Sequence, residues 1–316
     1  MGYAGNDCPR SGWADLEPGS PSTDKSRRIN MMQGRANLAP ESTAERTALW
    51  RALHVEIDAA PHVFEDRVGL RLLAPGAEWR RRPDMDPDFT KTFRASMVAR
   101  ARFVEDLVIE QADRGVAQYV ILGAGLDTFA QRRTDVACRM RIFEVDQPAP
   151  QEWKRQRLTA LGYGIPEWLR FVPVDFEAGG SVWQALAEAG FDAKQSAIIA
   201  STGVSMYLTK EATLATFRQV AALAPGSTLA MTFMLPLYLM PPDVRLQLGQ
   251  ALEGARASGT PFISLFAPEE IMAMARSAGF QDVRHVPPSA LAQRYFTNRK
   301  DGLQLSSAEE FLVATT

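Results

Sequence analysis

The stretch Gln118-Tyr-Val-Ile-Leu-Gly-Ala-Gly-Leu-Asp-Thr128 begins as a short apolar run and ends in a turn with two glycines. A compact apolar run bounded by glycine is typical of a buried strand. Glycines directly after a strand allow the backbone to approach a ligand closely, because they carry no side chain. The stretch therefore predicts a buried strand that turns into a helix at a ligand-binding edge, although the same glycines could form only a tight connection.

Apolar runs and helical segments alternate beyond this turn. Alternation of this kind predicts a parallel sheet with helices on both faces. The expected strands are Arg141–Val145, Leu169–Val174, Ser196–Ala200, Ser227–Phe233, Val283–Val286 and Glu310–Ala314, and the expected helices are Gln151–Leu161, Val182–Ala189, Lys210–Leu223 and Pro268–Gly279.

The chain before the first strand has a different composition and a different spacing of apolar residues. Its first thirty residues are rich in Gly, Pro, Ser and Asp without a period, which predicts a flexible arm over residues 1–30. Apolar residues then recur at helical spacing over Ser42–Leu72 and again over Phe89–Arg114. We expect residues 31–114 to form a helical lid or substrate region and residues 115–316 to form a Rossmann-like domain.

Composition excludes several functional classes. Among 316 residues, 35 basic and 37 acidic side chains give a net charge of −2, so no basic field for nucleic acid or an anionic membrane is expected. The longest apolar stretch, Thr228–Met240, is too short to span a bilayer and contains a proline. Two distant cysteines and three histidines predict no metal site. No signal peptide is apparent, and we expect a cytoplasmic protein.

The second and third expected strands end in acidic residues. Asp146 follows Gly125 by 21 residues, the distance at which a carboxylate meets the hydroxyls of an adenosine ribose. This spacing suits a nicotinamide-dependent oxidoreductase equally well, and Asp146 could also merely begin a turn before Pro148. The next strand end, Asp175-Phe176, offers a carboxylate for an adenine amine and an apolar neighbour for the ring face.

Position 128 separates the two cofactor classes. Dinucleotide-binding fingerprints need a third glycine or an alanine for tight packing at the pyrophosphate, and this chain has Thr128. A ligand with adenosine but no phosphates fits better. We therefore predict S-adenosyl-L-methionine (SAM) as the cofactor.

At this point the sequence resembles the leucine carboxyl methyltransferase family, in particular its bacterial SAM-dependent branch. The resemblance implies a Rossmann-like class I methyltransferase fold, with a mostly parallel seven-stranded sheet, an antiparallel last strand and an N-terminal helical lid. The stretches that carry it are Val98–Asp106, Val120–Thr128, Phe143–Pro148, Val174–Phe176, Gly203–Thr209 and Arg294–Leu303.

The resemblance also implies roles for single residues. Arg100 corresponds to the arginine that reaches the SAM carboxylate, with Arg102 as a rival. The cofactor-binding residues implied beside Arg100 are Gly123, Gly125, Asp146, Gln147, Asp175 and Phe176. The chain departs from the family at Thr202, where a glutamate is usual, and threonine supplies no charge to the SAM ammonium.

We expect a SAM-dependent O-methyltransferase that acts on a small-molecule carboxylate or acidic hydroxyl. A carboxylate acceptor needs no base, whereas an ordinary hydroxyl does, and few bases are available. Tyr207 is the predicted catalytic residue that contacts the acceptor. The apolar loop Leu235–Met240 suits a hydrophobic, polyketide-like acceptor, although core packing explains it almost as well. The alternatives are a SAM-binding protein that no longer transfers methyl groups and a nicotinamide-dependent oxidoreductase.

Overall fold

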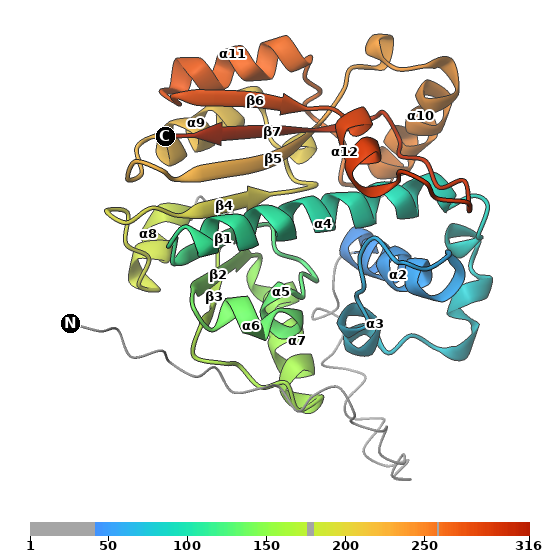
Figure 1. The fold of residues 1–316 in the computed structure, drawn as a ribbon, viewed down its shortest axis with the longest axis horizontal. Coiled ribbons are helices and arrows are strands. Elements are labelled where there is room, and N and C mark those ends of the chain that lie inside the picture. Colours follow the sequence, from blue (N-terminus) through green and yellow to red (C-terminus); the bar gives the residue numbers. More distant parts are fainter. Residues whose placement is uncertain (1–41, 176–179, 258) are drawn as a thin grey trace.

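A computed structural model describes residues 42–175, 180–257 and 259–316 of the protein. Its seven strands form one sheet in the order β3-β2-β1-β4-β5-β7-β6 (Figure 1). Strands β1 to β5 are parallel, and β7 runs antiparallel to both β5 and β6. The strands are β1 Gln118–Leu122, β2 Arg141–Asp146, β3 Leu169–Pro173, β4 Ile198–Ser201, β5 Thr228–Met234, β6 Asp282–Val286 and β7 Glu309–Thr315. The expected Rossmann-like architecture with an antiparallel last strand is confirmed.

The helices cover both faces of the sheet. Side chains of α4, α5, α6 and α12 join the core on one face, and those of α8, α9 and α11 join the core on the other. The helices are α2 Ser42–Ile57, α3 Val68–Leu73, α4 Lys91–Asp113, α5 Phe129–Arg132, α6 Thr134–Ala137, α7 Pro148–Ala160, α8 Val182–Glu188, α9 Lys210–Ala221, α10 Pro242–Ala257, α11 Pro268–Ala278 and α12 Pro288–Tyr295; four short 3₁₀ helices are η1 Ala77–Arg81, η2 Pro83–Met85, η3 Ser205–Tyr207 and η4 Leu237–Leu239.

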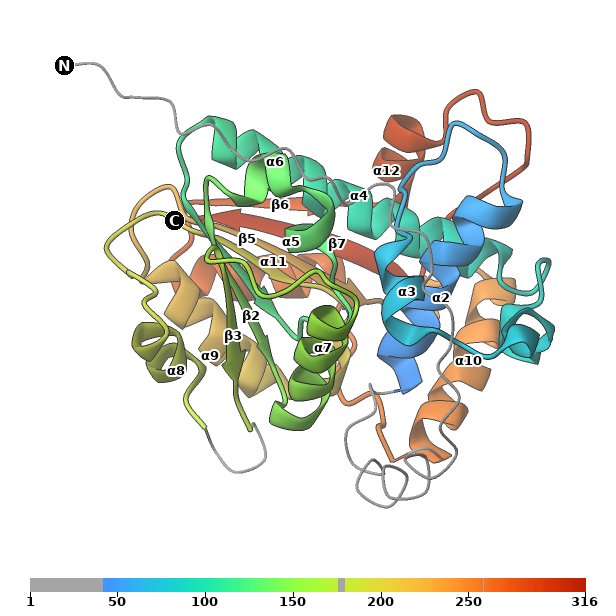
Figure 2. The ribbon, with the colours of Figure 1, turned by 90° about the horizontal axis from the view of Figure 1, so that it is seen from below.

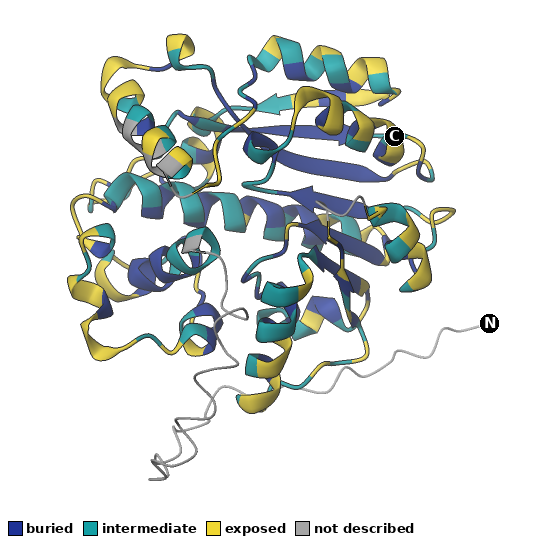
Figure 3. Cartoon of the chain, turned by 180° about the vertical axis from the view of Figure 1, so that it is seen from behind, coloured by how far each residue is buried: buried dark blue, intermediate teal, exposed yellow. Residues whose placement is uncertain are grey.

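Alternation along the strands assigns side chains to these two cores. On β2, Phe143 and Val145 face the α8–α9 side, whereas Ile142 faces the α4–α5 side. Strand β1 is buried along its whole length, as expected for a central parallel strand with helices on both faces. Figure 3 shows the buried strands enclosed by half-exposed helices. Glu144 points to the same side as Ile142, which makes it a buried charge beneath α7.

Helices α2, α3 and α10 lie beyond the carboxyl ends of the parallel strands, in the views of Figures 1 and 2. Helix α2 packs along α4 and brings its first turn to the glycine turn, where Ala44 lies beside Gly125. Ligands of open parallel sheets bind beyond these strand ends. The fold therefore places the expected site between the sheet edge and helices that approach it from both ends of the chain.

The structure differs from the sequence-based expectation in its connections. The stretch Ser42–Leu72 forms α2 and α3, separated by a loop that contains Pro61, because proline cannot continue a helix from α2. Helices α10 and α12 were not predicted. The apolar loop after β5 is divided: Leu235 and Met240 belong to the core, whereas Tyr238 and Leu239 of η4 are exposed.

No helix within the described residues is long and apolar enough to cross a membrane.

Candidate active site

The glycine turn after β1 admits no side chain at its first position. Gly123 adopts φ +70°, and a Cβ there would lie 2.6 Å from Cγ2 of Val204. Gly125 adopts φ +49°, and its Cβ would lie 3.4 Å from the Cβ of Ala44. Because side chains rarely adopt these backbone angles, both positions favour glycine. The turn is a stretch of backbone without side chains at these two positions, enclosed by Val204 after β4 and Ala44 of α2; we call it the backbone cradle. A cofactor can approach such a backbone closely.

Asp146 closes the cradle from the end of β2. Its carboxylate accepts a hydrogen bond from the Gly125 N–H and another, at 2.7 Å, from the Gln147 N–H. Gln147 is the N-cap residue of α7 and is partly buried. Each carboxylate oxygen can accept a second hydrogen bond, so Asp146 retains capacity for two ribose hydroxyls while it holds the glycine turn.

Asp175 lies at the next strand end. The Val174 N–H donates to the Asp146 carbonyl at 2.9 Å, which places the residue after it beside the ribose position. Asp175 is exposed, and its carbonyl accepts from the Gly180 N–H at 3.0 Å. Phe176 lies outside the described residues. The two strand-end acids therefore lie at one sheet edge, as the sequence predicts for a bound adenosine.

Arg100 reaches the same edge from α4. Its Nη1 donates to both carboxylate oxygens of Glu309, at 3.0 and 3.2 Å. A Cβ on Gly203, in the turn after β4, would lie only 3.0 Å from this nitrogen. Thr202 is partly buried just before that glycine. The guanidinium thus lies directly over the end of β4, whereas Arg102, its rival in the sequence, pairs with Asp106 on the half-exposed face of α4.

Tyr207 ends η3, the single turn that follows β4. Its ring packs edge-on against Phe262, with centroids 5.4 Å apart. The Ile263 N–H donates to the Met206 carbonyl at 2.6 Å and ties the same segments together. Tyr207 therefore lies against the connection between α10 and α11.

Comparison with known proteins agrees with this geometry. The leucine carboxyl methyltransferase family profile matches residues 44–221 of the chain. The Bacillus subtilis protein YktD, described by its name as a SAM-dependent methyltransferase, is 32% identical over 218 residues, which cover 69% of this chain and 71% of YktD. The chain belongs to the leucine carboxyl methyltransferase family. It is a SAM-dependent methyltransferase, and the nicotinamide alternative is set aside.

A further sequence relative and a solved structure also match the chain. A Mycobacterium bovis protein with the same description is 34% identical over 203 residues, which cover 61% of this chain and 66% of that relative. A solved structure from Thermobifida fusca, described as a methyltransferase, superposes with a TM-score of 0.54 at 17% identity, covering 90% of this chain and 97% of that one. At this identity the structural match supports the shared fold.

Helix α2 of the methyltransferase is tied to the glycine turn by an inner clamp of Arg51, Asp66 and Arg132. Arg51 donates to Asp66 at 2.9 Å and to the Leu126 carbonyl at 2.8 Å. Asp66 is fully buried and also accepts from two backbone N–H groups at the start of α3. Although burial raises the pKa of the Asp66 carboxyl, the charges of Arg51 and Arg132 lower it below its usual value. The clamp was not predicted, because its members are far apart in the sequence.

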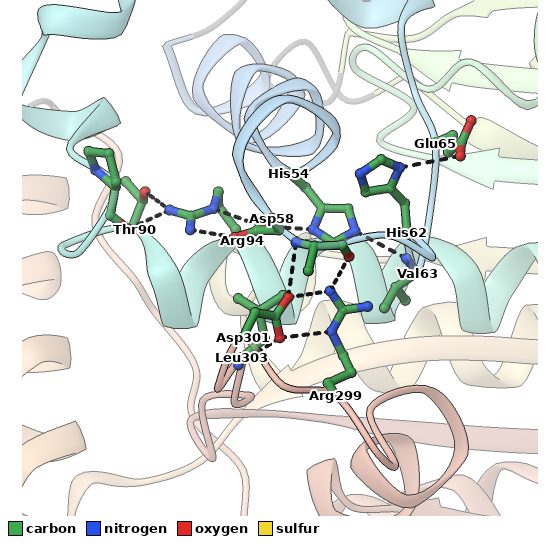
Figure 4. Close-up of polar contacts among 12 residues, drawn as sticks. His54, Asp58, His62, Val63, Glu65, Thr90, Arg94, Arg299, Asp301 and Leu303 are labelled. Atoms are coloured by element: carbon green, nitrogen blue, oxygen red, sulfur yellow. Dashed lines mark hydrogen bonds and ion pairs between the residues drawn. The ribbon is translucent and has the colours of Figure 1, made fainter.

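A second, outer clamp of His54, Asp58 and Arg94 holds the other end of α2 (Figure 4). His54 donates through Nδ1 to Asp58 at 2.8 Å and accepts through Nε2 from the Val63 N–H at 3.1 Å. Arg94 donates to both oxygens of Asp58, at 3.1 and 2.8 Å. Although burial raises the pKa of Asp58, these hydrogen bonds lower it overall. Both ring nitrogens of His54 are thus occupied.

The loop before β7 supports the outer clamp. Arg299 donates to the carbonyls of Ala59 and Pro61, both at 2.7 Å, and pairs with Asp301. Asp301 in turn accepts from the Ala59 N–H at 3.2 Å (Figure 4). The chain segment after α2 is therefore fixed by residues some 240 positions away.

A buried ion pair joins β2 to α7, near Asp146. Lys154 of α7 and Glu144 of β2 are both 1% exposed, with 2.5 Å between Nζ and Oε2. Burial raises the pKa of Glu144 to about 7, against the opposing charge of Lys154. Its other oxygen, Oε1, has no hydrogen-bond partner among the described residues. This pair links β2, which carries Asp146, to the helix that begins directly after it.

The arginine run in η1 and after it forms ion pairs. Arg80 donates to both oxygens of Glu56, at 2.7 and 2.6 Å, and Arg82 bridges Glu45 and Asp84. These contacts fix η1 and η2 against α2.

The described residues contain no group of three or more His, Cys, Asp or Glu side chains that could hold a metal ion.

Proposed function

We propose that the enzyme methylates an oxygen atom of a small-molecule carboxylate or acidic hydroxyl. The observation that carries this proposal is where the histidines lie. Both ring nitrogens of His54 are occupied, by Asp58 and the Val63 N–H, while His62 contacts Glu65 in the loop after α2 and His285 of β6 contacts Glu310 on the sheet face opposite α4. A hydroxyl of high pKa would need a base near neutral pH, and histidine is the usual one. An acceptor that is already ionised needs none.

We assign the cofactor roles from the positions of these residues at the carboxyl ends of the parallel strands. Gly123 and Gly125 would take the methionine portion, and Asp146 the ribose hydroxyls, with Gln147 beside them. Asp175 and Phe176 would bracket the adenine. Arg100 would bind the carboxylate of the methionine. SAM supplies an electrophilic methyl group on a sulfonium, whose thioether is the leaving group, and the protein contributes orientation and exclusion of water.

The acceptor would lie between helices α2 and α3 and the segment after β5. That segment carries most of the large exposed apolar side chains: Tyr238 is 72%, Leu246 68% and Ile263 57% exposed. An apolar ligand that covers these side chains would remove them from water. They support a hydrophobic, polyketide-like acceptor, and residues 42–114 would act as its lid. Tyr207, beside this segment, would orient the acceptor oxygen.

Transfer of a labelled methyl group tests the proposal. The enzyme is incubated with methyl-labelled SAM and a panel of apolar carboxylic acids, phenols and, as controls, amines of matched shape. Label in acids or phenols supports the proposal, and mild base separates the two because only methyl esters release methanol. Label confined to the amines would overturn it. Tyr207→Phe should lower turnover of the labelled acceptor while leaving affinity for S-adenosylhomocysteine (SAH), the demethylated cofactor product, unchanged.

A further inference from the structure

We propose that Glu309, together with Arg100, forms the receptor for the amino-acid end of SAM, with Glu309 accepting from the cofactor ammonium. This assigns to β7 the negative charge that Thr202 does not supply at the end of β4. The inference rests on the cofactor site proposed above and is independent of the acceptor.

A short chain of contacts places Glu309 at the cofactor edge. The glycine turn packs on Val204, since a Cβ on Gly123 would lie 2.6 Å from its Cγ2. The neighbouring Gly203 lies under the Arg100 guanidinium, where a Cβ would be 3.0 Å from Nη1. That nitrogen donates to both Glu309 oxygens. Only the Arg100 side chain therefore lies between the Glu309 carboxylate and the backbone that would hold the methionine portion of SAM.

The fold fixes the position of Glu309 firmly. It begins β7 and pairs in register with Met234, the last residue of β5. Because β7 runs antiparallel, its first residue lies at the carboxyl edge of the parallel strands, where the ligand binds. Its side chain points to the α4 side, since Phe311, two residues on, belongs to the core on that side. Glu310, the next residue, points to the other face and pairs with His285.

The chemistry of the pair matches a zwitterion. The side chains of Arg100 and Glu309 are 17% and 13% exposed, so both are largely removed from water. A partly buried ion pair contributes little net stability, because desolvation offsets the attraction. A free α-amino acid presents a carboxylate and an ammonium on one carbon atom. An arginine beside a glutamate offers the complementary charges in the same small space, with charge-assisted hydrogen bonds to both groups.

The competing account gives Glu309 only an indirect role, in which it orients Arg100 toward the cofactor carboxylate. The two accounts differ for a ligand that has the ammonium and lacks the carboxylate. Decarboxylated SAM is such a compound. Under the proposal its binding depends on Glu309, whereas under the competing account it does not.

Calorimetric titration of the whole protein tests this. The ligands are SAH, decarboxylated SAM and 5′-methylthioadenosine, which lacks the amino-acid end. We expect Glu309→Gln to weaken SAH and decarboxylated SAM by about 10- to 100-fold, the effect of one lost hydrogen bond between charged groups. Affinity for methylthioadenosine should not change. Glu309→Asp should recover part of the loss, and Glu310→Gln, the neighbour on the other face, should leave all three affinities unchanged.

Two results would overturn the inference, and a third would contradict the cofactor site on which it rests. Unchanged SAH affinity in Glu309→Gln would remove Glu309 from the site. A loss for SAH without a loss for decarboxylated SAM would reduce Glu309 to a positioning residue for Arg100. Failure of the wild-type protein to bind methylthioadenosine or SAH would instead contradict the cofactor site itself, and retained methylthioadenosine binding in the variant shows that it is folded.

Discussion

The inner and outer clamps hold the same helix, α2, by the same physical means and to different parts of the enzyme. Arg51 of the inner clamp bonds to buried Asp66 and to the carbonyl of Leu126 in the glycine turn. In the outer clamp, Asp58 binds Arg94 of α4, which also donates to the Pro87 carbonyl and the Thr90 hydroxyl and lies six residues before Arg100. Each clamp buries a carboxylate. Burial alone would raise the pKa of each carboxyl, but Arg51 and Arg132 lower that of Asp66, and hydrogen bonds from His54 and Arg94 lower that of Asp58.

The difference lies in what each clamp touches. The inner clamp connects α2 to the backbone of the glycine turn, where we propose that the cofactor binds. The outer clamp connects α2 to α4, and the segment after α2 is held by the loop before β7. We infer that disruption of either clamp costs stability, whereas disruption of the inner clamp alone also weakens cofactor binding.

The largest effect is expected from Arg51→Met. Asp66 is 0% exposed and would keep only Arg132, at 4.0 Å, and its backbone donors. Removing the nearer partner of a buried ion pair costs about 3–4 kcal/mol of unfolding free energy. Denaturant unfolding measures the loss, and titration with SAH should show affinity at least about tenfold weaker, since Leu126 loses its partner. Unchanged SAH affinity in a folded variant would separate the lid from the cofactor turn.

Arg94→Met is the matched change in the outer clamp. Its guanidinium is 3% exposed, and Asp58 would keep His54 as a partner. We expect a loss of about 2–3 kcal/mol by the same unfolding measurement. SAH affinity should equal that of the wild type, and a loss as large as that in Arg51→Met would abolish the distinction between the clamps.

The sequence predicted the parts of this enzyme that depend on local pattern. Strand β1, Gln118–Leu122, is the apolar run that the sequence predicted before the glycine turn, and Asp146 ends the next strand as expected, because apolar runs and turn residues act locally. Helix α10 was missed, since Gly249 and Gly254 in its interior weaken the helical signal. The clamps and Glu309 could not be found this way. Arg100 and Glu309 are 209 residues apart, and only the folded topology brings them together.

The stability contributed by Glu144 should depend on pH in the opposite sense to that contributed by the two clamp carboxylates. Its pKa is raised from 4.5 to about 7, so the folded state holds its proton more tightly than the unfolded state. The resulting stability is present below pH 4.5 and lost as pH rises through about 7, by roughly 3 kcal/mol. Asp58 and Asp66, with lowered pKa values, act in the opposite sense and lose stability only below pH 3.8.

A double variant isolates this contribution. Glu144→Gln with Lys154→Met replaces the pair by neutral side chains of similar size. The melting temperature of the wild type should fall more than that of the double variant between pH 4.5 and 7. Parallel curves over this range would show that Glu144 is ionised throughout.

The smallest stability effect is expected from Gly203→Ala. The substitution forces alanine to φ +71° and presses its Cβ against Arg100, at 3.0 Å. Gly115→Ala is the matched control, with φ +93° and no neighbour within 4 Å. Both should cost about 1 kcal/mol in unfolding free energy through backbone strain. Only Gly203→Ala should weaken SAH binding, because it displaces the guanidinium, and equal effects on binding would contradict the placement of Arg100.

The most direct test of the cofactor site is calorimetric titration of SAH into the wild type and Asp146→Asn. Asparagine can still accept from the Gly125 N–H through its single oxygen, while it loses the hydrogen bond from the Gln147 N–H and the charge offered to the ribose. We expect binding of roughly micromolar affinity in the wild type and a loss of about 10- to 100-fold in the variant. Asp113→Asn, an exposed residue paired with Arg139, should bind like the wild type. Equal affinity in Asp146→Asn would place the cofactor elsewhere and contradict the site described here.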